Sequence, residues 1–100
     1  MFDALAEPTR RRILDQLRDR PRTVGELVTT LDVSQPSVSK HLRVLRDAGL
    51  VEAHKDAQRR VYELRPEALA ELLAWVEPYR RLWASRLDAL ERHLDAKERP

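Results

Sequence analysis

The sequence predicts a mainly α-helical protein with one small β-hairpin, an α+β fold. Three features of the pattern support this prediction. Two short helical segments are joined by a tight turn near residue 33. Two segments of alternating polar and apolar residues follow directly after Gly49, as the strands of a hairpin do. A leucine-rich region with seven-residue spacing then fills the last third of the chain.

The composition indicates one domain with a small core. The chain has 100 residues, of which 42% are hydrophobic and 36% are charged, so we expect a single domain over residues 1–100. It contains no cysteine, which excludes disulfides, thiolate metal sites and cysteine nucleophiles. No apolar stretch approaches the roughly 18 residues of a membrane span, and residues 1–5 lack the pattern of a signal peptide. We therefore expect a cytoplasmic protein without a membrane partner.

The polar residues give no indication of an enzyme. Asp and Glu are scattered along amphipathic segments, and no nucleophile stands in a pattern with a base. Two glycines are too few for a glycine-rich phosphate loop. The sequence therefore predicts no catalytic residues and no cofactor.

Capping signals define the helices of the first half. A short helix is predicted near residues 2–6 and a second over 8–18, with 20–22 as a linker. Thr23 and Glu26 then form a capping-box pattern ahead of a two-turn helix. After a turn at residues 32–33, Ser34 is a good N-cap for a helix over 35–48, which Gly49 ends. Two short helices joined in this way are typical of a helix-turn-helix.

Two strands are predicted after the second of these helices. Val51 and Ala53 alternate with polar residues over 50–55, and Tyr62 and Leu64 share one face of the segment 60–64. Residues 56–59 form the turn between the strands. A hairpin in this place is a wing, so the fold class is refined to a winged helix-turn-helix.

The C-terminal region carries a long apolar stripe. Leu69, Val76, Trp83 and Leu90 recur every seven residues. Because proline removes a helical hydrogen bond, Pro78 divides the region into helices predicted over 66–76 and 78–95, although a kink remains the alternative to a break. We expect these helices, residues 66–95, to serve both the core and a two-fold dimer interface with the first helix. The predicted interface residues are Phe2, Leu5, Leu72, Tyr79, Trp83, Leu87 and Leu90.

The helix over 35–48 has the features of a DNA-reading helix. On a helical wheel Val38, Leu42 and Leu45 form the core stripe, and the opposite face is polar and cationic. The N-terminal residues of such a helix meet base edges and its flanks meet phosphates; Gln can read adenine and Arg can read guanine. The plain alternative is a solvated helix face. The candidate DNA-binding residues on this helix are Gln35, Ser37, Ser39, Lys40 and Arg43.

Further cations lie outside this set. Lys55, Arg59 and Arg60 bracket the wing tip, where they can hold phosphates or enter a minor groove, although hairpin tips are also charged for solubility alone. We expect Arg46 and Asp47 to contribute surface charge rather than base reading, and His41 to be packed. Of the three arginines that begin the second helix, Arg10, Arg11 and Arg12, we expect one to contact a phosphate and the others to pair with Glu7, Asp15 or solvent.

Residues 2–14 and 34–51 together resemble the ArsR/SmtB family of winged-helix repressors, and the resemblance extends to about Arg65. The C-terminal part, with Trp75, Pro78-Tyr79-Arg80-Arg81 and Trp83, resembles the cysteine-free autorepressor-type branch. The resemblance implies a bacterial, nucleoid-associated homodimer that binds operator DNA and represses transcription. It also implies that Gln35, Ser37, Ser39 and Lys40 lie in the DNA-reading helix and that Arg59 and Arg60 lie in the wing.

The departures from the family concern metal and the wing turn. Where many relatives carry a cysteine pair, this chain has Val24-Gly25-Glu26-Leu27-Val28. Asp88, Glu91, His93 and Asp95 do not match the spacing of the family's terminal-helix site, so no metal site is expected within one chain, and a site pooled across a dimer stays open. Ala57 and Gln58 occupy the wing turn where the family often has glycine.

These patterns together predict a sequence-specific double-stranded DNA-binding regulator. We expect a homodimeric repressor that reads a pseudo-palindromic operator through the helix 35–48 and the wing 51–64. The alternatives are a winged-helix module for protein contacts and a repressor that senses a metal or a small-molecule effector near Trp75, Tyr79 and Trp83.

Overall fold

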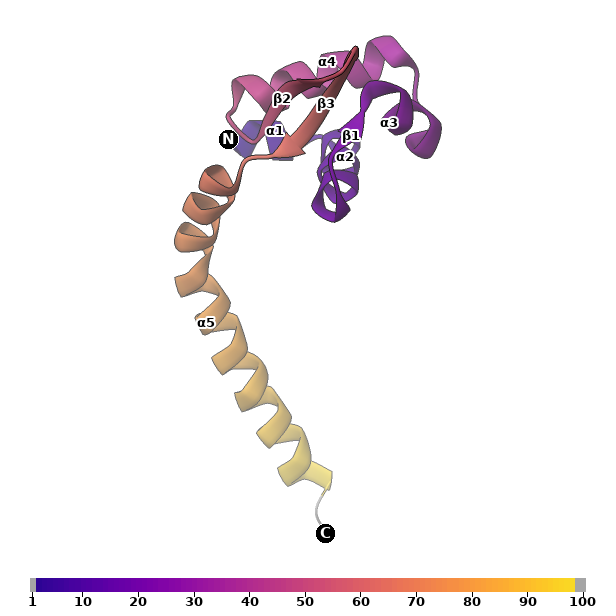
Figure 1. Ribbon diagram of the computed structural model, residues 1–100. Helices are drawn as coiled ribbons and strands as arrows, with labels where there is room; N and C mark the ends of the chain where they lie inside the picture. Colours follow the sequence, from indigo (N-terminus) through magenta and orange to yellow (C-terminus); the bar gives the residue numbers. More distant parts are fainter. Residues whose placement is uncertain (1, 99–100) are drawn as a thin grey trace. The chain divides into compact units, whose positions relative to one another are not determined.

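The computed structural model describes residues 2–98, and it is mainly helical with one small antiparallel sheet (Figure 1). The predicted fold class is confirmed. The chain forms two units that divide between Ala68 and Leu69. The elements are α1 (Phe2–Leu5), α2 (Pro8–Asp19), β1 (Arg22–Thr23), α3 (Val24–Leu31), α4 (Gln35–Asp47), β2 (Val51–Asp56), β3 (Arg59–Leu64) and α5 (Pro66–Glu98).

The helix-turn-helix is built by local caps, as predicted. The Thr23 hydroxyl accepts a hydrogen bond of 3.2 Å from the Glu26 backbone N–H, and the Glu26 carboxylate accepts one of 3.3 Å from the Thr23 N–H. Asp32 ends α3 in the left-handed region at φ 53° and donates its N–H to the Val28 carbonyl. This residue turns the chain toward α4.

The ends of α4 also follow from its sequence. The Ser34 hydroxyl caps the Ser37 N–H at 3.3 Å. Beyond the other end, Gly49 adopts φ 79°, which glycine reaches without a steric cost. The helix ends at Asp47 with Ala48 as its C-cap, one residue earlier than predicted.

The core of the first unit lies between α2, α3, α4 and the sheet. Val38, Leu42 and Leu45 are 0%, 1% and 0% exposed, so the predicted apolar stripe of α4 faces inward. Since these three positions fix the rotation of the helix, the opposite face of α4 is turned to solvent. The buried cluster comprises Ala4, Ile13, Leu17, Leu27, Leu31, Val38, Leu42, Leu45, Leu50, Val51, Tyr62 and Ala68.

The sheet has three antiparallel strands in the order β1-β3-β2. Arg22 was predicted as part of a linker, which is wrong: it pairs with Tyr62 in β1, and the N-cap residue Thr23 pairs with Val61. Two residues are too few to show the alternation that identifies a strand.

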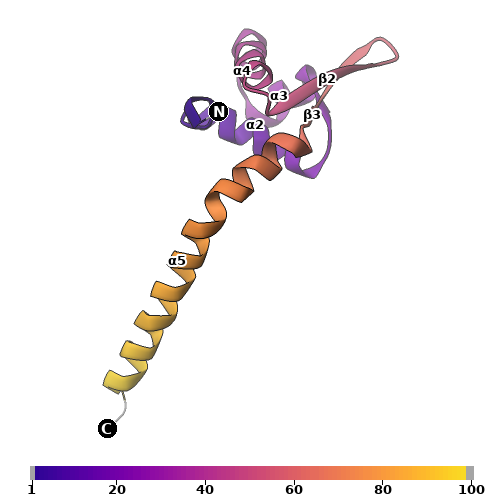
Figure 2. The ribbon, with the colours of Figure 1, turned by 90° about the vertical axis from the view of Figure 1, so that its left-hand side faces the viewer.

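The hairpin β2–β3 closes more tightly than predicted. Its ladder runs from Val51 opposite Leu64 to Asp56 opposite Arg59, so the turn contains only Ala57 and Gln58 rather than four residues. Ala57 takes φ 58°, the region usually given to glycine. The hairpin tip projects away from the helices of this unit (Figure 2).

The C-terminal region is a single helix, α5, and the predicted division into two helices at Pro78 is wrong. A proline inside a helix removes one hydrogen bond and crowds the carbonyl four residues earlier, at a cost of about 3 kcal/mol, but the alanines, leucines, glutamates and arginines elsewhere in α5 are strong helix formers. Glu77 also bridges this turn, because Arg80 donates to it at 2.7 and 2.9 Å and Arg81 lies at 3.7 Å. The hydrogen bonds from Arg80 lower the pKa of Glu77. The apolar stripe of α5 is therefore uninterrupted.

A membrane-spanning helix would need a length and an apolar composition that no helix within residues 2–98 combines.

Candidate nucleic-acid interface

The polar face of α4 is exposed where the sequence places the DNA-reading residues. Gln35, Ser39, Lys40 and Arg43 are exposed, and Ser37 is half-buried in the first turn. The helix begins at Gln35, so small and neutral side chains stand at its N-terminal end and cations follow. The rotation set by the buried stripe thus leaves four of the five predicted residues exposed and Ser37 partly covered.

The cations of the first unit differ in whether a carboxylate, a backbone carbonyl or neither is their partner. Arg18, Arg20, Arg59 and Arg65 each have a carboxylate within ion-pair distance. Some lysine and arginine side chains within residues 2–68 have neither a carboxylate partner nor a hydrogen bond. They are Arg11, Lys40, Arg43, Arg46, Lys55 and Arg60. All of these except Arg11 lie on α4 or on the hairpin, so the positive charge left without a partner is concentrated there.

Two arginines of α2 donate hydrogen bonds to backbone carbonyls of neighbouring helices. The Arg10 guanidinium donates to the Ala4 carbonyl at 2.7 Å and to the Asp3 carbonyl at 3.3 Å. The Arg12 guanidinium donates to the Leu31 carbonyl at 3.0 Å. Arg10 also lies close enough to the Glu7 carboxylate to help lower its pKa, whereas no pair of Arg12 with Glu7 or Asp15 is found among the described residues. Arg11 is exposed.

His41 is packed between α2 and α4, as predicted. Its side chain is 15% exposed, and its Nδ1 lies 3.4 Å from the Arg10 guanidinium and 3.8 Å from the Glu7 carboxylate. Partial burial pushes the pKa of Glu7 upward, but the Arg10 backbone N–H and the nearby His41 outweigh it, so the pKa lies below its ordinary value. His41 therefore belongs to the junction between these helices.

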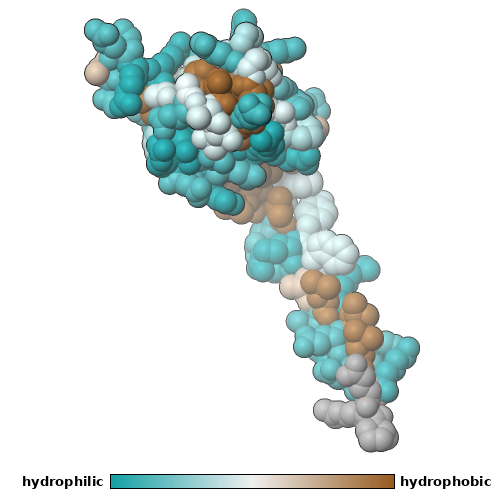
Figure 3. All heavy atoms as spheres, turned by 90° about the vertical axis from the view of Figure 1, so that its right-hand side faces the viewer, coloured by the Kyte–Doolittle hydropathy of each residue, from teal (hydrophilic) through white to brown (hydrophobic). Residues whose placement is uncertain are grey.

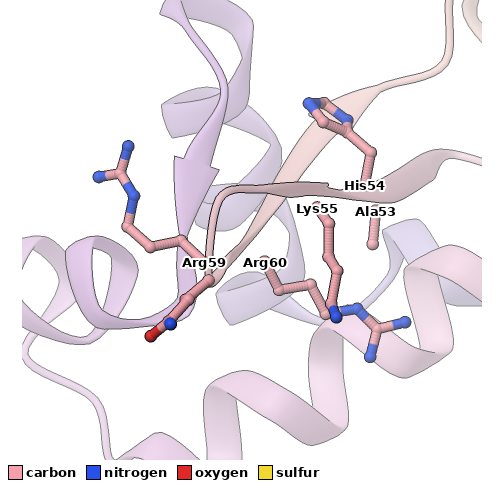
Figure 4. A pocket seen from close by; sticks show the side chains of 6 residues that line it. Ala53, His54, Lys55, Arg59 and Arg60 are labelled. Carbon is pink, nitrogen blue, oxygen red and sulfur yellow. The ribbon is translucent and has the colours of Figure 1, made fainter.

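Strand alternation separates the cations of the wing. Lys55 and Arg60 are cross-strand partners on one side of the hairpin, whereas His54 and Arg59 point to the other side (Figure 4). Arg59 lies 3.4 Å from the Asp56 carboxylate. On the same side, His54 lies 3.5 Å from Glu63. The three predicted wing residues thus form two groups, and Arg59 is partly neutralised.

A hollow of about 330 Å³ connects the wing to α4. Its lining residues are Ser39, Arg43, Arg46, Asp47, Arg60 and Tyr62. A second hollow, of about 260 Å³, lies at the wing tip beside Lys55, Arg59 and Arg60 (Figure 4). The first one contains Arg46, which the sequence analysis assigned to general surface charge. The signal that could have found it is its spacing, since residues 39, 43 and 46 lie along one face of a helix.

The predicted dimer residues lie on α1 and α5. On α5, Tyr79, Trp83, Leu87 and Leu90 are more than half exposed, and Leu72 is half-buried. The Trp75 and Tyr79 rings stack along the helix with their centres 4.9 Å apart. Brown and pale residues alternate with teal ones along α5 in Figure 3. On α1, Phe2 is 53% exposed, whereas Leu5 packs against the core of the first unit.

No three His, Asp or Glu side chains within the part of the chain that the structure describes are grouped closely enough to hold a metal ion. Asp88, Glu91, His93 and Asp95 are all exposed on α5.

Comparisons with known proteins assign this architecture. The family described as "Bacterial regulatory protein, arsR family" matches residues 7–53. The HTH-type transcriptional regulator Rv2034 of Mycobacterium tuberculosis is 41% identical over 96 residues, which cover 96% of this chain and 87% of that protein. The transcriptional repressor SdpR of Bacillus subtilis is 34% identical over 76 residues, covering 76% and 84%.

A solved structure agrees with these relatives. The ArsR-like transcriptional regulator from Rhodococcus sp. RHA1 superposes with a TM-score of 0.72 at 32% identity, covering 91% of this chain and 86% of that one. The winged helix-turn-helix prediction is therefore confirmed, and the relatives are transcriptional regulators rather than enzymes. The chain belongs to the arsR family of bacterial regulatory proteins.

Proposed function

We propose that the protein is a homodimeric transcriptional repressor that binds a pseudo-palindromic operator in duplex DNA. The proposal is carried by one observation. Within residues 2–68, all lysines and arginines that lack both a carboxylate partner and a hydrogen bond, except Arg11, lie on α4 or the hairpin. Nucleic-acid affinity comes largely from neutralising backbone phosphates. Cations already paired with carboxylates contribute less to this affinity. The distribution of the cations without such partners therefore marks the surface proposed to meet DNA.

The base-reading residues lie on α4. Gln35, Ser37 and Ser39 occupy its first two turns, where small polar side chains allow a helix to approach the floor of the major groove. Gln35 has the amide that pairs bidentately with adenine, and Arg43 has the guanidinium that pairs with guanine. Lys40 is a point charge and serves a phosphate.

The wing holds the flanking backbone. Lys55 and Arg60 lie on one side of the hairpin and Arg59 on the other, and a projecting hairpin with cations on both sides can enter a minor groove or contact its phosphates. With about 6–8 phosphate contacts per dimer, log K should fall with log salt at a slope of about −0.9 per contact.

The homodimer is proposed on the basis of the apolar stripe of α5. Tyr79, Trp83, Leu87 and Leu90 follow spacings of three or four residues along one uninterrupted helix and are exposed in the single chain. A second copy is the occupant that covers such a stripe, together with Phe2, Leu5 and Leu72. Two-fold symmetry then places two reading helices roughly 34 Å apart, one turn of DNA.

Repression is the proposed direction of regulation. SdpR, a relative that matches 76% of this chain, is named a transcriptional repressor. A dimer bound at a promoter prevents other proteins from binding there. This mechanism requires only the proposed DNA-binding and dimer surfaces. Such a regulator acts at the nucleoid, where its operators lie.

The experiment that tests the proposal is selection of bound sequences from a random pool of duplex DNA, with and without zinc. We expect a pseudo-palindrome with half-sites one helical turn apart, unaffected by zinc. Recovery of no preferred sequence would favour the alternative of a winged-helix module that contacts other proteins. Release of the selected duplex by zinc would instead identify a metal-responsive repressor.

A further inference from the structure

The hollow between α4 and the wing contains Arg46, which has no part in the proposed DNA contacts above. We propose that Arg46 of α4 and Arg60 of β3 form a two-arginine clamp for one backbone phosphate of DNA in each subunit. The inference deepens the proposed function and rests on it. It assigns one phosphate to a pocket formed jointly by the reading helix and the wing.

Helical spacing brings Arg46 to this place. Ser39, Arg43 and Arg46 stand at positions i, i+4 and i+7 of α4, on one face of the helix, and all three line the hollow. Arg46 is exposed and, within the residues that the structure describes, its side chain has no hydrogen bond and no ion pair. Its guanidinium is therefore available to an external anion.

Strand geometry brings Arg60 to the same hollow. Arg60 points to the side of the hairpin away from His54 (Figure 4). Tyr62 is two residues further along β3, so it faces the same side as Arg60, and both line the hollow. The Arg60 guanidinium carbon lies 6.0 Å from the centre of the Tyr62 ring, at the outer range of a cation–π contact. Tyr62 is buried, so the ring offers Arg60 a fixed support beside α4.

The charge of the hollow fits a phosphodiester. Three arginines and one aspartate line it, and none of these arginines is paired with the Asp47 carboxylate. A guanidinium donates two parallel hydrogen bonds to a phosphate, and two guanidiniums from different elements can hold its two free oxygens. The hollow therefore combines an excess of positive charge with the donor geometry that a tetrahedral anion requires.

The position along α4 favours a phosphate over a base edge. Arg46 lies one residue before the end of the helix, whereas base edges are met by the N-terminal residues of a reading helix. Arg60 and Tyr62 of the wing also line the hollow, so Arg46 faces the junction of helix and wing. Arg43 lies between the two regions and retains its role as a reader.

The clamp can be tested with Arg46→Gln and the control Arg18→Gln. Arg18 is exposed on α2, outside the proposed interface, so its replacement removes the same charge elsewhere. Binding is measured by fluorescence anisotropy at several salt concentrations, on the duplex recovered by selection and on a scrambled duplex. We expect Arg46→Gln to weaken both duplexes about tenfold, with a salt slope reduced by about 1.8, which is two contacts per dimer at about 0.9 each.

A second measurement locates the phosphate. Neutral methylphosphonates are placed one at a time along the selected duplex. We expect one position in each half-site where a methylphosphonate weakens binding by the wild-type protein. At this position the same methylphosphonate should not weaken binding by Arg46→Gln or Arg60→Gln any further. Arg18→Gln should retain the wild-type pattern.

The outcomes separate the clamp from the proposed function. A wild-type protein with no preference for any duplex would remove the function and the clamp together. The clamp alone would be overturned if the wild-type protein binds its selected duplex and Arg46→Gln has the wild-type salt slope. It would also be overturned if Arg46→Gln remains sensitive to a methylphosphonate at every position where the wild type is.

Discussion

The Arg12 guanidinium donates a hydrogen bond of 3.0 Å to the carbonyl of Leu31, the last residue of α3. The final carbonyls of a helix have no partner within it, so this contact supplies one from α2. An arginine that stands in a run of three therefore has a structural role that its neighbour Arg11 does not share.

Replacement of Arg12 should reduce stability. We expect Arg12→Ala to lower the free energy of unfolding by about 1 kcal/mol, since a helix-end carbonyl loses its donor. Arg11→Ala is the matched control, because Arg11 is exposed and has no partner among the described residues. The measurement is urea denaturation at one fixed protein concentration. Equal losses in the two variants would argue against a specific role for Arg12.

The base-reading assignment predicts two different kinds of loss. Gln35→Ala and Arg43→Ala should each relax the preference at one base pair by about 1–3 kcal/mol. Lys40→Ala should weaken binding to all sequences by a similar factor, because a phosphate contact carries no sequence information. Titrations against single-base variants of the selected duplex distinguish the two patterns. Uniform losses for Gln35→Ala and Arg43→Ala would exclude them as readers.

The capping box predicts a dependence of stability on pH. The hydrogen bond from the Arg20 guanidinium at 2.8 Å and that from the Thr23 N–H hold the pKa of Glu26 below its ordinary value of 4.5. Folding thus favours the carboxylate, so its contribution is complete above the unfolded-state pKa and is lost as pH falls through the folded-state pKa. We expect Glu26→Gln to lower Tm at neutral pH, and the difference from wild type to shrink below pH 4.5. The measurement is thermal unfolding of both proteins across this pH range. A difference in Tm that does not change with pH would show that the ionised Glu26 carboxylate contributes nothing.

The α5 stripe predicts that one charge will disrupt the dimer. Trp83 is 66% exposed in the single chain, and a glutamate in its place would be buried without a partner in a symmetric interface. We expect Trp83→Glu to be monomeric by light scattering at micromolar concentration and to lose affinity for the palindromic duplex. Ser85→Glu, two residues along on a different face of α5, should remain a dimer. Dimers of the Trp83→Glu protein would place the interface elsewhere.

The wing turn predicts a stabilising glycine. Ala57 adopts φ 58°, a conformation that costs an L-residue about 1–2 kcal/mol, whereas the additional chain entropy of glycine costs about 0.5–1 kcal/mol. We expect Ala57→Gly to raise the free energy of unfolding by about 0.5–1 kcal/mol. Ala89→Gly, inside α5, should have the opposite sign. Chemical denaturation of both variants provides the comparison.

Short-range signals were sufficient to predict much of this fold. The caps at Thr23 and Ser34 act over three residues, and Gly49 marks a backbone conformation that few other residues adopt. With the ends of α4 predicted, the helical repeat indicated that Leu42 and Leu45 are buried and that Lys40 and Arg43 are exposed.

The features that sequence patterns missed depend on distant partners. The strand β1 exists because Arg22 and Thr23 meet β3 about 40 residues later, a pairing with no local signature. Arg46 joins Arg60 only after the hairpin folds beside α4. The error at Pro78 has a different origin, because its surroundings are local: the break was predicted from the proline alone, without the pairs that Glu77 makes with Arg80 and Arg81.

The alternation along β3 makes the wing sensitive to its length. Arg59 and Arg60 are consecutive, yet they face opposite sides of the hairpin. Deletion or insertion of a single codon before them would shift the ladder by one residue and exchange their sides. Arg60 and Tyr62 would then both move to the far side, and Arg59 would turn to the side that now carries Arg60. Relatives that differ by one residue in this turn should therefore contact the DNA backbone differently, even where every cation is retained.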